Sequence, residues 1–279
     1  MLGDIVGAPG RQAVGQLMPE IRSRWAPDMV LANAENTANG TGLTPDLYRK
    51  LCEGGIDAVT LGDHVYKKVQ IARTLETEAN IIRPANLPAG AVGRRWMRLP
   101  PRDVQPASGY NGPPLYVLTV LGRIFTSLPC DDPFATIEQV LAELPEPQPL
   151  VLVEIHAEAT SEKIAMGWYL DGRVAAVVGS HTHVATADAR ILPGGTAYIT
   201  DMGMCGPHES VLGRRIDRVL RHMTTAMPAP FDVAEGDPRV NGIFIEIDTR
   251  ARRAVAIERI ELAADRNRPP FVAGNARWA

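Results

Sequence analysis

The sequence predicts an α/β fold built around a largely parallel sheet. Short apolar runs, typical of buried strands, alternate with segments of helical periodicity from the start of the chain to about residue 200. Such alternation indicates βαβ units. Beyond it, residues 239–248 and 254–262 alternate apolar and polar side chains, which predicts an antiparallel pair joined by a turn over residues 249–253.

The strands before residue 200 are predicted from short runs rich in Val, Leu, Ile and Ala. The runs cover residues 29–32, 58–61, 115–121, 150–155, 175–178 and 197–199.

The helices are predicted from apolar spacing and from their ends. From Val14 to Ile21, apolar residues recur at i, i+3, i+4 and i+7, which predicts a helix over residues 12–25. Thr44 and Pro45 are a typical N-cap and first residue of a second helix. Similar spacing predicts helices over residues 134–144, 161–169 and 216–223.

Composition indicates an ordinary globular chain. Hydrophobic residues make up 45% of the 279 residues and charged residues 22%, with a net charge of −3, so neither disorder nor a stable nucleic-acid partner is expected. Three widely spaced cysteines exclude a disulfide framework. No apolar run is long enough to span a membrane, and we expect a cytoplasmic protein.

Residues 1–279 contain no clear linker or internal repeat, so we predict a single domain. Residues 99–114 are rich in proline, glycine and polar residues, which predicts a surface insertion before the strand at 115–121.

Acidic, amide and histidine side chains follow the predicted strands, where open α/β sheets bind ligands. Imidazole nitrogens and carboxylate oxygens suit Zn, Mn or Fe, and there are too many for one tetrahedral ion. Two metals are therefore expected, which would activate a water for attack at phosphorus. The residues are Asp4, Glu35, Asn36, Asp63, His64, His156, His181 and His183.

Each of these residues also has a simpler interpretation. A single histidine at a strand end is usually a hydrogen-bonded structural residue, and Asp4 or Glu35 alone is typical of a helix cap or a surface acid. In amidohydrolase-type sites, an HxH motif usually comes first along the chain. Here the HxH motif, His181 and His183, comes late, so the order differs. The spacing of the early glycines matches neither a dinucleotide fingerprint nor a P-loop.

The order GD, AEN, GDH, HAEATSEK, GSHTH and TDMGMCGP resembles the YmdB-like branch of the calcineurin-like metallophosphoesterases, from Gly3 to about Leu262. The most specific of these motifs is HAEATSEK at residues 156–163. The resemblance implies a layered α/β sandwich with mixed sheets and helices outside. It also implies a cytoplasmic bacterial phosphodiesterase for 2′,3′- or 3′,5′-cyclic nucleotides that forms homo-oligomers.

The resemblance further implies a role for each site residue. Asp4, Asn36 and His183 would bind one divalent metal and Asp63, His156 and His181 a second, with Glu35 bridging both. Fe or Mn is expected, with Zn or Mg as alternatives. A bridging hydroxide would attack phosphorus, and His64 would donate a proton to the leaving group. A positioning role is the alternative for His64.

Arg123 and Cys205 are secondary candidates. Arg123 is expected either to bind the substrate phosphate or to lie on the surface, and Cys205 either to act as a ligand or redox group or to fill the core. Two other functions remain open. One is a phosphomonoesterase or nuclease of the same fold, and the other is a regulatory protein that binds a nucleotide or partner through an impaired metal site.

Two departures from the family bear on the metals. The family has Asn where this chain has Asp63, which adds a negative charge, so we expect a higher pH optimum or tighter binding of the second metal. Only Met1 and Leu2 precede the GD motif. We therefore expect a truncated first strand, an unanchored Asp4 and weaker binding of the first metal.

Overall fold

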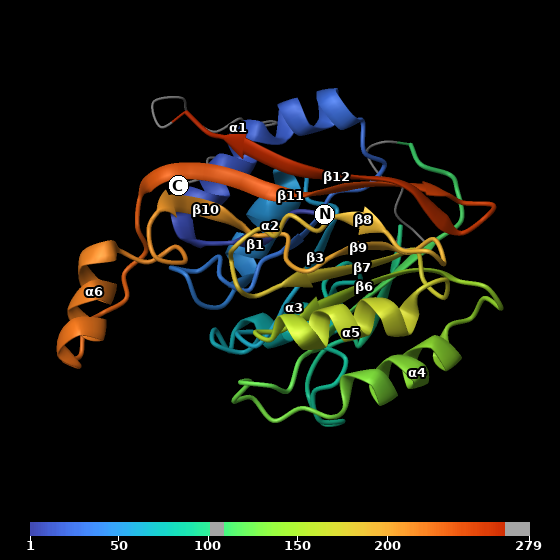
Figure 1. The fold of residues 1–279 in the computed structure, drawn as a ribbon, viewed down its shortest axis with the longest axis horizontal. Coiled ribbons are helices and arrows are strands. Elements are labelled where there is room, and N and C mark those ends of the chain that lie inside the picture. The colour runs from blue at the N-terminus through green and yellow to red at the C-terminus, as the bar shows by residue number, and fades with distance from the viewer. Residues whose placement is uncertain (101–108, 266–279) are drawn as a thin grey trace.

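The structure, a computed structural model, describes residues 1–100 and 109–265, which form three sheets with helices on the outside (Figure 1). The largest sheet has six strands in the order β4-β5-β6-β7-β9-β8. β5, β6, β7 and β9 run parallel, and β4 and β8 are antiparallel at the edges. The bounds are Trp96–Leu99 for β4, Leu115–Leu121 for β5, Leu150–His156 for β6, Ala176–Ser180 for β7, Arg190–Ile191 for β8 and Ala197–Ile199 for β9.

The two smaller sheets lie against the large one. The first has the order β1-β10-β11-β12, in which β1 is parallel to β10 and the rest are antiparallel. The second is the parallel pair of β2 and β3. The bounds are Asp4–Ile5 for β1, Leu31–Asn33 for β2, Ala58–Thr60 for β3, Met204–Glu209 for β10, Gly236–Asp248 for β11 and Arg253–Ala263 for β12.

The helices cover the outer faces of these sheets. Figure 1 shows α4 and α5 on one side of the six-stranded sheet, α1 beyond the β11–β12 hairpin, and α6 projecting from the body. None of the helices in the described ranges is long and apolar enough to cross a membrane. The bounds are Gly7–Trp25 for α1, Pro45–Glu53 for α2, Ile71–Thr77 for α3, Pro133–Glu143 for α4, Thr160–Leu170 for α5 and Ile216–Thr225 for α6.

Three apolar clusters fill the spaces between these layers. One packs α4 and α5 on the large sheet and includes Tyr116, Ile137 and Met166. A second lies between the large sheet and the smaller ones, where Val117 and Ile243 belong to the same cluster. The third surrounds α1 and α2. Burial of apolar surface on both faces explains why β5 and β6 are near-continuous apolar runs.

The structure confirms the α/β class and the predicted strands, with shifts of one to three residues at some ends. It differs at α1, which begins at Gly7 and not at residue 12. The N-cap residue, Val6, has no capping side chain, so the sequence carries no signal for this start. β10 was not predicted, because its sequence contains Gly206 and Pro207 and no apolar alternation. β4, β8 and α3 were also not predicted. A surface insertion was expected over residues 99–114. Leu99 is instead the last residue of β4, and residues 101–108 lie outside the described residues.

The expectation that Asp4 is unanchored is wrong. Leu2 is 1% exposed, and its backbone N–H donates to the Leu31 carbonyl at 2.7 Å. Met1 donates to the Ile243 carbonyl at 2.8 Å. Asp4 and Ile5 then pair with β10. Hydrogen bonds to β2, β10 and β11 therefore compensate for the short length of this segment.

Gly3 is expected to tolerate no side chain. An alanine Cβ there would lie 1.9 Å from the Gly203 carbonyl oxygen, so backbone must move. We expect Gly3→Ala to lower the free energy of unfolding, measured by urea denaturation, by about 1–3 kcal/mol. Gly90→Ala, which meets no atom within 4 Å, is the control and should change stability by less than about 0.5 kcal/mol. Equal stability of the two variants would contradict this account of the N-terminal anchor.

Candidate metal centre

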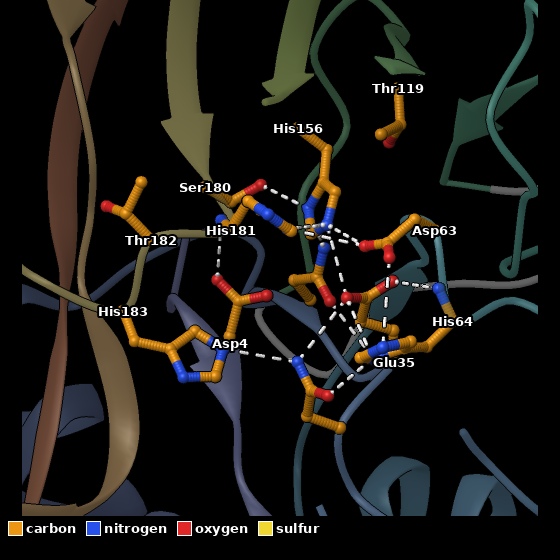
Figure 2. A network of polar contacts seen from close by, with 12 residues as sticks. Asp4, Glu35, Asp63, His64, Thr119, His156, Ser180, His181, Thr182 and His183 are labelled. Carbon is orange, nitrogen blue, oxygen red and sulfur yellow. Dashed lines mark hydrogen bonds and ion pairs between the residues drawn. The ribbon is translucent and has the colours of Figure 1, made fainter. Parts of the chain in front are cut away.

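The candidate ligands gather at the carboxyl ends of strands from all three sheets (Figure 2). Asp4 lies in β1, and Glu35 follows β2 by two residues. Asp63 follows β3, and His156 is the last residue of β6. The loop after β7 contributes the two remaining histidines. Parallel strands place their carboxyl ends at one edge, so residues far apart in the sequence meet there.

Glu35, Asp63, His156 and His181 form the tightest part of the site. One nitrogen or oxygen from each lies within 4.8 Å of the others. The Nε2 atom of His156 is 3.1 Å from Glu35 Oε1 and 3.0 Å from Asp63 Oδ1. His181 Nδ1 lies 3.0 Å from the same nitrogen. Two imidazoles and two carboxylates that converge in this way can hold a metal ion.

Asp4, Asn36 and His183 lie on the other side of Glu35. The Asn36 amide nitrogen is 3.4 Å from Glu35 Oε1 and 3.2 Å from His183 Nε2. One oxygen of Asp4 accepts from the His181 backbone N–H at 3.2 Å. Its other oxygen, Oδ1, is buried and has no hydrogen-bond partner within the described residues. A buried carboxylate oxygen without a donor fits a cation ligand.

The pKa values follow the same pattern. Burial, with nearby carboxylates, raises the pKa of Asp4 well above its usual value. Burial opposes the charged form of His156, but Glu35 and Asp63 outweigh it and raise the pKa of His156 well above its usual value. In this arrangement a proton on His156 compensates the carboxylates. A metal ion would replace that proton, because ligation requires the neutral imidazole.

His183 is already set up as a neutral ligand. Burial lowers the pKa of His183. Its Nδ1 atom donates to the Leu212 carbonyl at 3.0 Å, which leaves the lone pair on Nε2, on the side of Asn36. His181 and His183 have φ values of 96° and 65°, which are unusual for side chains of this size and typical of functional sites.

His64 lies beside both groups of ligands and outside the tight cluster (Figure 2). Its backbone N–H donates to Glu35 Oε2 at 2.9 Å, and its Nδ1 is 2.8 Å from Asn36 Oδ1. Its Nε2 is 3.7 Å from Asp63 Oδ2. The side chain is 27% exposed, so it can exchange a proton with solvent.

A buried carboxylate that was not predicted, Glu154, orients His156 from behind. It accepts hydrogen bonds from Asn33 Nδ2 at 2.8 Å, Thr119 Oγ1 at 2.9 Å and Ser180 Oγ at 2.6 Å. Because Ser180 donates to Glu154, its oxygen is free to accept from His156 Nδ1 at 2.9 Å. This hydrogen bond directs the Nε2 atom of His156 toward the cluster. The signal in the sequence was a charged residue inside an apolar strand run.

A buried ion pair holds the loop between the two histidines after β7. Lys163 Nζ donates to Asp201 Oδ2 at 2.7 Å, and both side chains are almost fully buried. The same oxygen accepts from the backbone N–H and hydroxyl of Thr182 at 3.1 and 2.8 Å. Removing one partner of such a pair typically costs about 3–5 kcal/mol. Lys163 therefore positions His181 and His183 and does not contact the cluster directly.

Glycine is required where His156 packs. A Cβ on Gly62 would lie 2.3 Å from His156 Nε2. The glycine of the GDH motif therefore makes room for the imidazole of another strand. Glu158, from the HAEATSEK motif, lies with its Oε2 3.3 Å from His181 Nε2.

Neither secondary candidate belongs to the cluster of converging ligands. Arg123 is exposed on the loop after β5, and its backbone N–H, not its guanidinium, donates to Glu162. Its role in phosphate binding stays a prediction. Cys205 is buried in the core, where its thiol donates to the Asn241 carbonyl at 3.2 Å and burial raises its pKa to about 12. The burial of Cys205 in the core confirms the expectation that it fills space there.

A small pocket of about 50 Å³ opens onto the cluster. Its lining includes Asp63, His156 and His181 and residues 125–127. A larger and mostly apolar cavity, about 210 Å³, lies between α1 and β11 and is lined by none of the candidate ligands. The chemistry of the side chains, not cavity size, identifies the site.

Comparisons with known proteins give relatives over nearly the whole chain. A family model described as YmdB-like protein matches residues 1–260. A 2′,3′-cyclic-nucleotide 2′-phosphodiesterase from Bacillus subtilis is 42% identical over 264 residues, which cover 95% of this chain and 96% of that protein.

Two solved structures share the fold. A hypothetical protein from Thermus thermophilus has a TM-score of 0.85 at 41% identity and covers 95% of this chain and 98% of its own. A crystal structure titled as a novel phosphatase from Mycoplasma pneumoniae has a TM-score of 0.86 at 31% identity, with 94% and 92% covered. These likenesses confirm the predicted calcineurin-like metallophosphoesterase fold. The chain therefore belongs to the YmdB-like family.

Proposed function

We propose that this chain, a metal-dependent phosphoric diester hydrolase, acts on 2′,3′-cyclic nucleotides and binds two divalent cations. The observation that carries the proposal is the convergence of Glu35, Asp63, His156 and His181 within 4.8 Å. The name of the Bacillus subtilis relative supports the substrate class.

The residues present fit two cations. Asp63, His156 and His181 would hold one ion, and Asp4, Asn36 and His183 the other, with a carboxylate oxygen of Glu35 available to each. Asp4 Oδ1, which has no hydrogen-bond partner in residues 1–100 and 109–265, supports the second position. Mn²⁺ or Fe²⁺ suits this mixed nitrogen and oxygen donor set. When bound, such ions supply an activated water and neutralise the charge of the phosphodiester.

His64 is proposed as the general acid. Its ring lies within 3.5 Å of Glu35 and 3.7 Å of Asp63 but remains partly exposed, so it can reach an oxygen that leaves phosphorus and recover its proton from solvent. The hydrogen bond from its backbone N–H to Glu35 fixes the loop after β3, which carries His64, relative to the ligands. In this role His64 would protonate the leaving alkoxide, and the ligand side chains would hold the cations that neutralise the phosphate charge.

The proposed function predicts metal-dependent hydrolysis of 2′,3′-cyclic AMP. Purified protein should turn over this substrate when Mn²⁺ is added and lose turnover with a chelator. His64→Ala should reduce kcat by about 10²- to 10⁴-fold, because general acid catalysis contributes that much, while Mn²⁺ binding stays intact. His222→Ala, at an exposed histidine on α6, is the matched control.

Two outcomes would contradict the proposal. Rapid hydrolysis of p-nitrophenyl phosphate without hydrolysis of the cyclic nucleotide would indicate a phosphomonoesterase. Binding of Mn²⁺ and nucleotide without any turnover would indicate a regulatory protein.

Asp63 is predicted to raise the pH at which the enzyme becomes active. Asp63→Asn removes one negative charge beside His156 and His181. A less negative site favours loss of a proton from the water that attacks phosphorus, so the pKa of that water should fall. The acidic limb of the kcat/KM profile should therefore move to lower pH. Asp46→Asn, on the exposed face of α2, should leave the profile unchanged. Identical profiles for wild type and Asp63→Asn would refute this effect.

A further inference from the structure

The loop after β5, residues 122–130, carries a large apolar side chain that core packing does not use. Phe125 is 84% exposed, and Ile124 beside it is 44% exposed. Phe125 also has a φ of 63°, in the left-handed region that bulky side chains rarely adopt. An exposed aromatic residue in strained backbone is a reason to look for a functional role.

Glu162 fixes this loop against the metal centre. Its two carboxylate oxygens accept the backbone N–H groups of Arg123 at 2.8 Å and Ile124 at 3.1 Å. Glu162 lies in the first turn of α5, six residues after His156. Gly122 permits the close approach, because a Cβ there would lie 2.5 Å from both Ala157 Cβ and a Glu162 oxygen. The position of Phe125 is therefore tied to that of His156.

Phe125 bounds the pocket that opens onto the ligands. Phe125 lines a space of about 50 Å³ together with Thr126, Ser127, Asp63, His156 and His181. That space holds a few water-sized groups, enough for phosphate oxygens and too small for a nucleoside. A nucleotide whose phosphate occupies the pocket must extend out over its rim, where Phe125 is the exposed aromatic side chain.

We propose that Phe125 determines substrate preference by stacking on the nucleobase of the cyclic nucleotide. This inference rests on the proposed function and adds a subsite to it. Stacking on an aromatic face tolerates any base, so Phe125 would favour nucleotides over phosphodiesters without a base and discriminate little between bases. The backbone N–H groups of Arg123 and Ile124 hold the loop in place. Phe125 is the aromatic residue of the segment 122–130 and supplies its flat ring.

The first test is binding, because it does not require turnover. Titration calorimetry with Mn²⁺-loaded protein would compare adenosine 3′-monophosphate with inorganic phosphate. Phe125→Ala should weaken nucleotide binding by about 5- to 150-fold and leave phosphate binding unchanged, which is the range expected for loss of one stacked base. Phe125→Trp should restore nucleotide binding. Phe231→Ala, at an aromatic residue 45% exposed and outside this pocket, is the matched control.

The second test is kinetic and uses 2′,3′-cyclic AMP beside 1-O-methylribose 2′,3′-cyclic phosphate, which has no base. Phe125→Ala should raise KM for the nucleotide only, with kcat little changed. Unchanged nucleotide affinity, or an equal loss for nucleotide and phosphate, would overturn the inference. If wild type binds the nucleotide through Phe125 but hydrolyses neither substrate, the proposed reaction fails while the stacking subsite stands.

Discussion

Burial of carboxylates at one sheet edge is the constraint on which the rest of this structure depends. Asp4, Glu35, Glu154 and Asp201 are all at most 1% exposed, and an isolated buried charge is costly. Each has a different compensation. Lys163 neutralises Asp201, and three neutral donors satisfy Glu154. For Glu35, burial opposes the charge, but His156 and His64 outweigh it and lower its pKa. Burial raises the pKa of Asp4 well above its usual value, so Asp4 is the carboxylate that a nearby cation would stabilise.

Glycines let other parts of the chain pack closely beside these residues. Gly3 packs on the carbonyl of Gly203, Gly62 on the ring of His156, and Gly179 has the Thr200 carbonyl 1.7 Å from where a Cβ would be. These glycines lie directly beside ligand or ligand-supporting residues. The result is a set of strand ends from three sheets that hold their side chains with little freedom. Such preorganisation is what a metal site and an in-line displacement at phosphorus require.

The sequence was sufficient for the strands that are buried on both faces and for the order of the ligand motifs, because apolar runs and polar residues at their ends are local signals. It was insufficient where the cause is not local. β10 has no apolar pattern and exists because β1 and β11 flank it. Leu2 is held by bridges to Ala32 of β2 and Gly242 of β11, and β1 then pairs with β10, which the two residues before the GD motif cannot reveal. The role of Glu154 is not visible in the sequence, because its donors come from β2, β5 and β7.

The most direct test of the central claim is the number of divalent cations that the protein binds and their effect on stability. Metal-free protein would be titrated with Mn²⁺ by equilibrium dialysis and unfolded thermally at each concentration. We expect two ions per chain and a rise in Tm that reflects about 2.7 kcal/mol for each site at a free concentration one hundred times its Kd. Binding of no ion, or a Tm that does not change with Mn²⁺, would contradict the account.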